Sequence, residues 1–288
     1  MKPDYILSRH PFEGCVAPFE TAGIVLFGAG FDGTSSYRPG SRFAPTAIRA
    51  ETLYSQENYS PYFQKDLTDL PLHDLGDIDI PFGDKELTLR RIRETAVTLL
   101  TAGKKPLAIG GEHLISLPLI EATLEKYPDL RIVQLDAHLD LMDELFGERI
   151  SHGTVMRRAH DLLGDGRIYQ TAIRSGSREE YEFASEHTRL FQFNVNGFCK
   201  TAEELAGFPV YVTIDLDAFD PALLPGTGTP EAGGIFFPEF IRFLEALLPL
   251  NIIGGDMVEL SPQIDPTHNS TIVAAKALRE ILMVMASC

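Results

Sequence analysis

The sequence predicts an α/β fold built on a parallel sheet of about eight strands. Short apolar runs rich in valine and isoleucine alternate with segments in which apolar residues recur at helical spacing. This alternation is typical of β-α-β units. The chain of 288 residues is 44% hydrophobic and 23% charged, which is the balance of an ordinary globular protein. Because we see no internal repeat, low-complexity tract or linker, we expect one domain over residues 1–288.

Each candidate strand is a short apolar run, and the clearest reads PVYVTI at residues 209–214. The clearest helix lies between Asp84, which can cap its start, and Gly103, which can end it. Its apolar residues at helical spacing are Leu89, Ile92, Ala96 and Leu99. The candidate strands cover residues 24–27, 72–75, 106–109, 131–135, 167–173, 190–193, 209–214 and 251–254. Further helices are expected near residues 116–126, 154–163, 177–187, 238–248 and 271–286.

Residues 28–72 are predicted to be one long irregular stretch, which in a compact domain is usually functional. It opens with Gly28, Gly30 and Gly33, which match the dinucleotide-binding pattern G-x-G-x-x-G. That pattern requires a helix to follow, whereas TSSYRPGSRFAP follows here. We therefore read the glycines as points where the backbone turns or approaches another segment closely.

Composition argues against several classes of protein. No apolar run approaches the roughly 18 residues needed to span a bilayer, and the N-terminal stretch lacks the apolar core of a secretory signal. A formal net charge of −16 disfavours nucleic-acid and acidic-membrane partners. Cys15, Cys199 and Cys288 are too few and too widely spaced for a disulfide framework or a thiolate metal site, and their roles stay open. A cytoplasmic location is expected.

Ionisable side chains gather just after three of the predicted strands. The stretch LDAHLD supplies Asp136, His138 and Asp140, which in extended backbone would all project from one side. The stretch TIDLDAFDP supplies Asp215 and Asp217 in the same alternate spacing. The stretch GGEH brings Glu112 and His113 after another strand. Since open parallel sheets bind ligands at the carboxyl ends of their strands, we expect one shared site there.

The charges of this cluster predict two divalent metal ions. A single carboxylate after a strand often caps a helix, but several aspartates brought together without cations would repel one another. Asp136, Asp140, Asp215 and Asp217 carry four negative charges, which two divalent ions would neutralise. His113 and His138 complete a set of six ligands, enough for two ions that hold a shared hydroxide if some aspartates bridge. Oxygen-rich ligands without thiolate suit manganese, with zinc, cobalt or nickel as substitutes.

Together these motifs resemble the ureohydrolase family of arginases and agmatinases, most closely the bacterial agmatinases. The resemblance covers nearly the whole chain, because FDGTSSYRPGSRFAPTAIR at residues 31–49 and LHDLGDI at residues 72–78 also match. It implies a three-layer α/β/α sandwich with an eight-stranded parallel sheet, a homotrimer or homohexamer, and hydrolysis of a guanidino group to urea and an amine. The motifs, in order, are GGEH, DAHLD, SHGT, TIDLDAFDP and VELSP.

Carried over residue by residue, the resemblance assigns roles to the cluster. His113 and Asp140 bind one manganese, His138 and Asp217 the other, and Asp136 and Asp215 bridge the two. His152 corresponds to the histidine that shuttles protons, and Glu259 to the carboxylate that pairs with the substrate guanidinium. Asp140 could pass the proton from the bridging hydroxide to the leaving amine. Leu139 and Ser261 depart from the usual family residues, but neither replaces a ligand.

The substrate is indicated less directly. Arginases hold the amino-acid end of arginine partly through an asparagine two residues after the DAHxD motif, where this chain has Met142. This difference favours agmatine, a small cation, which would give putrescine and urea. Guanidinobutyrate, aminopropylagmatine and arginine stay open. So do a non-catalytic guanidino-binding protein and, with less support, a metal-dependent deacetylase of related fold.

The other histidines have no partner spacing and are read as surface or core residues: His10, His73, His160, His187 and His268.

Overall fold

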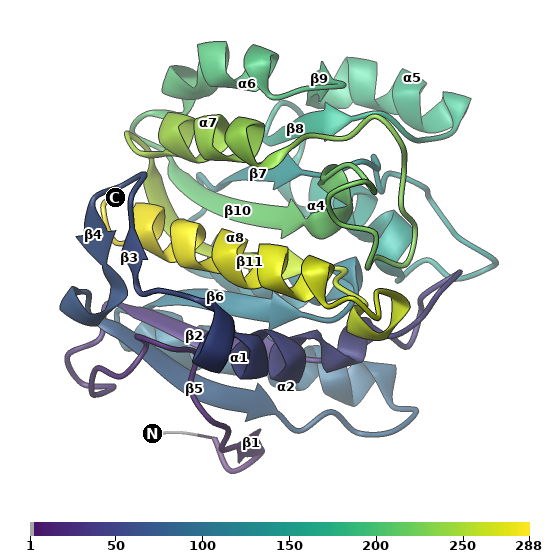
Figure 1. Ribbon diagram of the computed structural model, residues 1–288. Helices are drawn as coiled ribbons and strands as arrows, with labels where there is room; N and C mark the ends of the chain where they lie inside the picture. Colours follow the sequence, from purple (N-terminus) through teal and green to yellow (C-terminus); the bar gives the residue numbers. More distant parts are fainter. Residues whose placement is uncertain (1–2) are drawn as a thin grey trace.

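A computed structural model of the chain describes residues 3–288, so the first two residues of the N-terminal stretch lie outside it. Its centre is a nine-stranded sheet with the order β1-β5-β2-β6-β11-β10-β7-β8-β9 (Figure 1). Eight of the strands run parallel, and the short β1 pairs antiparallel with β5 at one edge. The strands are β1 (Ile6–Leu7), β2 (Ile24–Ala29), β5 (Leu72–Ile78), β6 (Lys105–Gly110), β7 (Arg131–Leu135), β8 (Ile168–Ile173), β9 (Arg189–Gln192), β10 (Pro209–Asp215) and β11 (Asn251–Val258).

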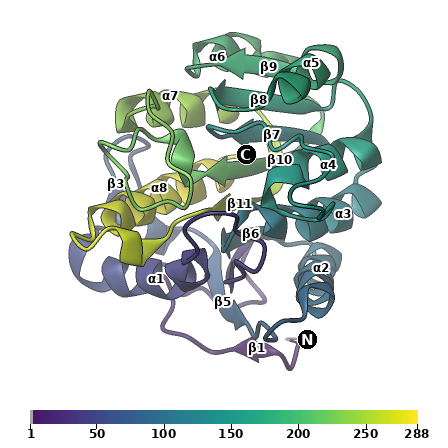
Figure 2. The same ribbon diagram turned by 90° about the vertical axis from the view of Figure 1, so that its right-hand side faces the viewer.

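Helices cover both faces of the sheet, which gives three layers, α/β/α (Figure 2). Alternate residues of a strand point to opposite layers, so on β2 Ile24 and Leu26 face one core while Val25 and Phe27 face the other. The first layer contains α1 (Ala44–Ser55), α6 (Asn196–Thr201), α7 (Phe237–Leu247) and α8 (Asn269–Met285). The second contains α2 (Lys85–Thr101), α3 (Ser116–Lys126), α4 (Val155–Leu163) and α5 (Arg178–His187).

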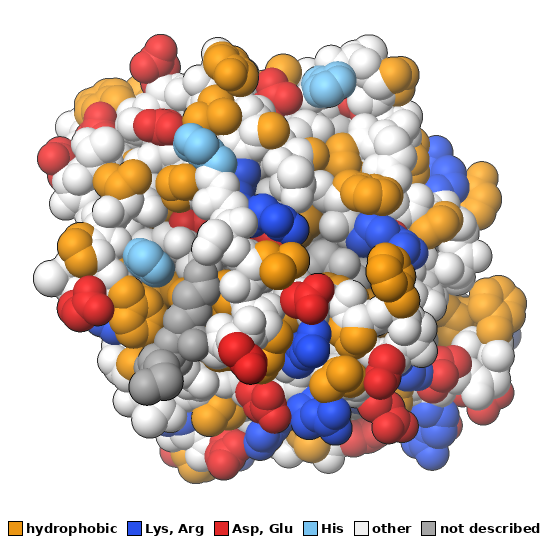
Figure 3. All heavy atoms as spheres, turned by 90° about the horizontal axis from the view of Figure 1, so that it is seen from below, with side chains coloured by type: hydrophobic (Ala, Val, Ile, Leu, Met, Phe, Trp, Pro, Cys, Tyr) orange, Lys and Arg blue, Asp and Glu red, His pale blue; other side chains and the backbone are white. Residues whose placement is uncertain are grey.

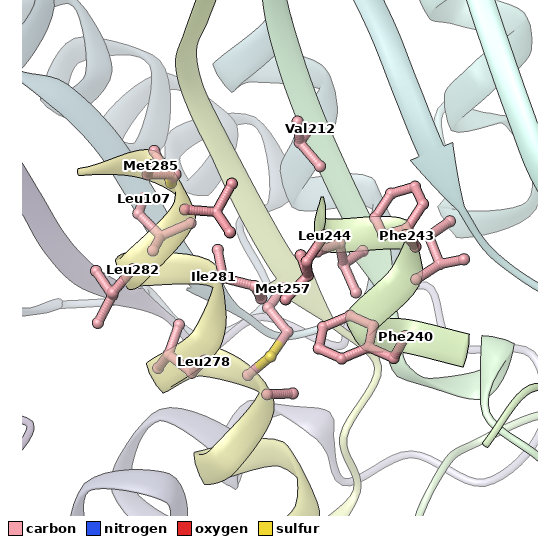
Figure 4. Close-up of a cluster of buried hydrophobic side chains, with 14 of the residues drawn as sticks. Leu107, Val212, Phe240, Phe243, Leu244, Met257, Leu278, Ile281, Leu282 and Met285 are labelled. Atoms are coloured by element: carbon pink, nitrogen blue, oxygen red, sulfur yellow. The ribbon is translucent and has the colours of Figure 1, made fainter. Parts of the chain in front are cut away.

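The core on the α7 and α8 side is built from interlocking aliphatic and aromatic side chains (Figure 4). Phe240 and Phe243 of α7 and Leu278 and Leu282 of α8 belong to this core and are fully buried, and Met257 of β11 lies between the two helices (Figure 4). Burying each such side chain contributes roughly 1.5–3 kcal/mol to folding. This packing holds the central strands in place and so positions their carboxyl ends.

The strand and helix predictions are confirmed, with three differences. The sheet has nine strands and not eight, because β1 adds a short antiparallel edge strand. Helix α1 and the β3–β4 hairpin (Tyr59–Ser60 and Lys65–Asp66) lie inside the stretch predicted to be irregular. Pro45, the last residue of the stretch TSSYRPGSRFAP, argues against a helix in the sequence, but it occupies the first turn of α1, where no intrahelical N–H bond is lost. Helix α6 is only six residues long and gave no periodic signal.

The glycines after β2 serve close backbone approach. A Cβ at Gly30 would lie 2.5 Å from the carbonyl oxygen of Arg42, so no larger residue fits without movement. No helix begins at Gly33: the next elements are a short 3-10 turn at Ser41–Phe43 and then α1. The rejection of a dinucleotide-binding turn at this place is therefore consistent with the structure.

One face of the molecule is mixed in charge despite the overall acidity (Figure 3). The face seen from below carries acidic and basic side chains next to one another, with hydrophobic side chains scattered between them (Figure 3). Within residues 3–288, no helix has the length and apolar character needed to cross a bilayer.

Candidate metal centre

The predicted site residues meet at the carboxyl ends of four neighbouring central strands, β6, β11, β10 and β7. His113 follows β6, Glu259 follows β11, and Asp215 and Asp217 lie at the end of β10. Asp136, His138 and Asp140 follow β7. The expectation that separate strands deliver these side chains to one edge of the sheet agrees with this arrangement.

The backbone after β7 is not the extended segment that the alternate spacing suggested. The strand ends at Leu135, and Asp140 has a φ of 53°, in the left-handed region that non-glycine residues seldom adopt. Two contacts outside the strand hold this path: the backbone N–H of Leu139 donates to the carbonyl of Ser175, and that of Met156 donates to the carbonyl of Asp140. The three side chains share a site because the tertiary structure bends the chain.

His113 faces three carboxylates at once. Its Nδ1 lies 2.9 Å from Asp140 Oδ2, 3.1 Å from Asp136 Oδ2 and 3.3 Å from Asp215 Oδ2. Nevertheless, Nδ1 is buried without a partner in hydrogen-bond geometry. A buried nitrogen surrounded by oxygens that it cannot all satisfy with one proton is the arrangement expected of a cation ligand.

His138 stands beside a second pair of carboxylates. Its Nδ1 lies 2.9 Å from Asp217 Oδ2 and 3.7 Å from Asp136 Oδ1. Two triads of potential metal ligands result, His113 with Asp136 and Asp140, and Asp136 with His138 and Asp217. Asp136 belongs to both triads, with one oxygen turned to each histidine.

Burial and mutual repulsion disturb the ionisation of the cluster. Burial and the charge of Asp136 raise the pKa of Asp140 to about 6. Burial also raises the pKa of Asp215, with Asp217 and Asp136 adding to the effect. Burial alone would lower the pKa values of His113 and His138, but the surrounding carboxylates raise both. Without cations, therefore, protons must offset the excess negative charge.

The donor set fits divalent metal ions. Carboxylate oxygens and imidazole nitrogens are ligands for such ions, and a metal would take the place of the protons that the cluster otherwise has to bind. None of the three cysteines belongs to a potential metal-binding group within residues 3–288. The prediction of an oxygen-rich site without thiolate is therefore consistent with the structure.

Glu259 lies beside the same site, and one of its two carboxylate oxygens is hydrogen-bonded. Its Oε1 accepts a hydrogen bond of 2.7 Å from the backbone N–H of His113. Its φ of 68° is, like that of Asp140, strained for a residue with a side chain. Burial and the nearby charge of Glu112 raise the pKa of Glu259, so a cation bound beside it would relieve an unfavourable charge.

His152 forms the opposite side of the site, in the loop after β7. Its Nε2 lies 3.1 Å from Ser36 Oγ, and its backbone N–H donates to Thr34 Oγ1. Burial lowers the pKa of His152 to about 4, with the charge of His113 contributing. The imidazole is therefore neutral at pH 7.

A cavity of about 250 Å³ opens beside these groups. Asp140, Asp215, Asp217 and Glu259 line it, together with Glu180, and no lysine or arginine among residues 3–288 does. Met142 also lines the cavity, so the residue singled out from the sequence as bearing on the substrate does face it.

Sequence reasoning missed several residues that surround the cluster. Gln134 Nε2 donates to Asp136 Oδ2 over 2.7 Å, and Thr213 Oγ1 lies 2.9 Å from His113 Nε2. The sequence signal that could have found them is a polar residue inside an otherwise apolar strand.

Away from the site, His160 and His187 both hydrogen-bond to Asp165, although their spacing in the sequence suggested no partner.

The fold and this site define a class: a three-layer α/β/α protein whose central strands end in a histidine–aspartate centre for divalent metals. Comparison with known proteins narrows it. The model of the arginase family matches residues 22–284. The chain is 44% identical to an agmatinase of Bacillus anthracis over 269 residues, 92% of each chain. It is 42% identical to an agmatinase of Bacillus subtilis strain 168 over 287 residues, 98% of this chain and 99% of that one.

Solved structures agree with the sequence comparison. The crystal structure of a putative agmatinase from Clostridium difficile matches with a TM-score of 0.91 and 42% identity, covering 93% of this chain and 99% of that one. The chain therefore belongs to the arginase family, as the motifs indicated.

Proposed function

We propose that this protein is a binuclear manganese hydrolase that cleaves agmatine to putrescine and urea. The observation that carries the proposal is the sharing of Asp136 by two histidine–aspartate triads beside a small acidic cavity. Two ions bridged by a carboxylate are the arrangement with which proteins supply hydroxide at neutral pH. The agmatinases to which the chain is similar over nearly their whole length support the choice of reaction.

The ligands divide between two ions. His113 and Asp140 would hold one, His138 and Asp217 the other, and Asp136 and Asp215 would bridge them. Oxygen-rich coordination favours manganese, with zinc, cobalt or nickel as substitutes. When bound, such a pair lowers the pKa of water from about 15.7 toward 7 and so supplies the nucleophile that an unreactive guanidinium requires.

Glu259 would hold the guanidinium. Because Oε1 already accepts from His113 N–H, Oε2 is left to accept a charge-assisted hydrogen bond from the substrate. The protein thereby fixes the cationic end of the substrate next to the metal ligands.

Asp140 and His152 would handle protons. Asp140 faces both His113 and the cavity, and so lies where a proton can pass to the leaving amine. His152 borders the same cavity, so it would exchange protons between the site and solvent.

The cavity favours a substrate with two positive charges. Three of the five carboxylates that line it would be metal ligands and Glu259 would pair with the guanidinium, which leaves the negative charge of Glu180. Within residues 3–288 the lining contains no lysine or arginine that could attract the carboxylate of guanidinobutyrate or arginine. Met142 in its wall offers no hydrogen bond to an amino-acid end group. Agmatine carries a guanidinium and an ammonium group and meets neither difficulty.

The direct test is urea release from agmatine, arginine, guanidinobutyrate and aminopropylagmatine by manganese-loaded protein. We expect agmatine to give the highest kcat/KM. The Glu259→Gln variant removes the negative charge and keeps the shape, and should lower kcat/KM for agmatine by about 10- to 100-fold. Glu125→Gln makes the same change on an exposed side chain of α3 and should leave the rate unaltered.

Two outcomes would count against the proposal. A rate for arginine well above that for agmatine would change the substrate. Fewer than two ions per chain and no urea from any substrate would favour a non-catalytic guanidino-binding protein. A homotrimer or homohexamer remains a prediction that light scattering would measure.

A further inference from the structure

Behind His113, on the side away from the cavity, a chain of buried polar groups leads into the sheet. Thr213 Oγ1 lies 2.9 Å from His113 Nε2, and Thr213 in turn lies 2.6 Å from Asp256 Oδ1. Tyr211 Oη donates to the other oxygen of Asp256 over 2.5 Å. Thr213 and Tyr211 belong to β10, and Asp256 lies on β11 directly beside Thr213. All four side chains are essentially inaccessible to solvent.

The direction of these hydrogen bonds follows from counting protons. Thr213 Oγ1 donates to one oxygen of Asp256, and Tyr211 Oη donates to the other. The single hydroxyl proton of Thr213 is thereby used, and its oxygen can only accept from His113. Ser116 Oγ, 3.4 Å from Thr213 Oγ1, can likewise only donate to that oxygen. His113 must then carry a proton on Nε2.

A proton on Nε2 leaves Nδ1 of a neutral imidazole as a free lone pair. Nδ1 is the atom that faces Asp136, Asp140 and Asp215. It is also the atom without a hydrogen-bond partner. The buried chain therefore selects the tautomer that binds a metal, and it holds the ring in the plane that aims Nδ1 at the carboxylates.

His138 lacks this support. Among residues 3–288, no protein group hydrogen-bonds to its Nε2, and a quarter of its side chain is exposed. The two halves of the metal centre are thus built differently, one with its histidine locked from behind and the other with its histidine partly open to solvent.

We propose that Thr213 and Asp256 are positioning residues that set the tautomer and orientation of His113 and so determine the affinity of one of the two metal sites. The inference rests on the proposed function for the presence of two ions. It goes beyond that function in naming the residues that position one of the two metal-binding histidines.

The test is a manganese titration of metal-free protein, with free Mn²⁺ followed by electron paramagnetic resonance. In Thr213→Val the shape is kept and the hydroxyl is lost. We expect one of the two bound ions to weaken by about 10- to 100-fold, the usual effect of losing such a partner, and the other to bind as before. Thr213→Ser restores the hydroxyl and should restore the affinity.

Two further variants separate this effect from general damage. Thr213→Ala lacks the hydroxyl but leaves a different shape, so a loss common to alanine and valine comes from the hydroxyl. Thr171→Val makes the same change at a buried threonine whose hydroxyl has no hydrogen-bond partner, on β8, which is separated from β10 by β7. It should bind both ions normally.

The results distinguish this inference from the proposed function. Thr213→Val and Thr213→Ala proteins that bind both ions as tightly as the wild type would overturn the positioning role. Equal weakening of both ions would overturn it as well. A wild-type protein that binds two ions but releases no urea from agmatine would contradict the proposed substrate alone, and the titrations would still decide the role of Thr213.

Discussion

This chain contains two clusters of histidine and aspartate that use the same side chains in opposite surroundings. One is the buried centre at the ends of the central strands. The other joins His160 of α4, Asp165 in the loop after it and His187 of α5 on the surface. In the surface cluster, Asp165 Oδ1 lies 2.8 Å from His160 Nε2 and 2.7 Å from His187 Nδ1, and all three residues are close enough to hold an ion.

The surface cluster and the buried centre differ in charge balance and in burial. The surface cluster has two imidazoles for one carboxylate, and 69% of the Asp165 side chain is exposed, so a proton and water satisfy it. The buried centre has two imidazoles for four carboxylates, and Asp136 is completely buried. Proximity of ligands is therefore not enough to indicate a metal. An uncompensated buried charge is the stronger signal.

Among the variants considered, the largest loss of metal affinity should come from removing one carboxylate of the buried centre. In Asp215→Asn, the amide oxygen can still accept from Asp217 N–H, but one negative charge is lost. We expect metal affinity to fall by more than the roughly 100-fold seen when only a supporting residue is lost. Because burial and neighbouring charges raise the pKa of Asp215, the metal-free variant should melt higher than the metal-free wild type. Manganese titration and calorimetry measure both effects.

The matched change on the surface is Asp165→Asn. This variant should bind metal and release urea as the wild type does. Loss of an ion from it would show that the surface cluster also binds metal, and the contrast between the two clusters would fail.

Removal of metal gives the next largest effect. Ions that bind only the folded chain should stabilise it by about 2.7 kcal/mol when free metal is 100-fold above its dissociation constant. Chemical denaturation with and without a chelator measures this difference. It should persist in His187→Ala and be greatly reduced in Asp215→Asn. Full retention in Asp215→Asn would mean that the stabilising ion binds elsewhere.

A smaller loss of metal affinity is expected from changes in the side-chain amides of Gln134 and Gln170, which form a hydrogen-bonded chain to Asp136 that we call the amide ladder. Gln134 donates to Asp136, and Gln170 donates to Gln134 Oε1 over 2.8 Å. Gln134→Leu should weaken metal binding by about 10-fold. It should also lower the free energy of unfolding by about 1–3 kcal/mol, because Gln170 is left with an unpaired buried donor.

Thr188→Val removes only the hydroxyl that donates to the far end of this ladder, at Gln170 Oε1. Its effect on metal affinity should be smaller than that of Gln134→Leu. The same manganese titration compares the two variants, and the reverse order would show that the ladder does not act through Asp136.

The smallest effect is the pH dependence of the surface cluster. Hydrogen bonds from His160 and His187 lower the pKa of Asp165. The stabilisation is therefore present above the ordinary aspartate value, about 3.9, and is lost as pH falls below it. Denaturation of metal-free wild type and Asp165→Asn between pH 3 and 6 should show a difference that shrinks toward the acid end. A difference that grows there would contradict the assignment.

Much of the fold was predictable because apolar patterns report burial directly. All eight parallel strands and six of the helices were predicted near their observed positions. The misses have local causes. The two residues of β1 are too few to show a pattern, and Pro45 hid α1 because a proline in a first helical turn looks like one that breaks a helix.

The gathering of the metal-ligand candidates was predictable in part, since parallel strands bring their carboxyl ends to one edge. The reason offered for Asp140 was wrong, because its backbone turns into the left-handed region after β7. The supporting residues Thr213 and Asp256 could not be found, since hydrogen bonds between neighbouring strands depend on strand order and register.

The sequence by itself determined three things about this protein: the parallel α/β sheet, the six candidate metal ligands, of which four are aspartates, and the likeness to the arginase family. These depend on residue type and local pattern, which are written along the chain. Only the tertiary structure decided which imidazole nitrogen meets which carboxylate, that Asp136 is common to two triads, and that His113 is held from behind while His138 is not. Such contacts join residues up to about a hundred positions apart, as between His113 and Thr213, and form only when the strands pack in their final order.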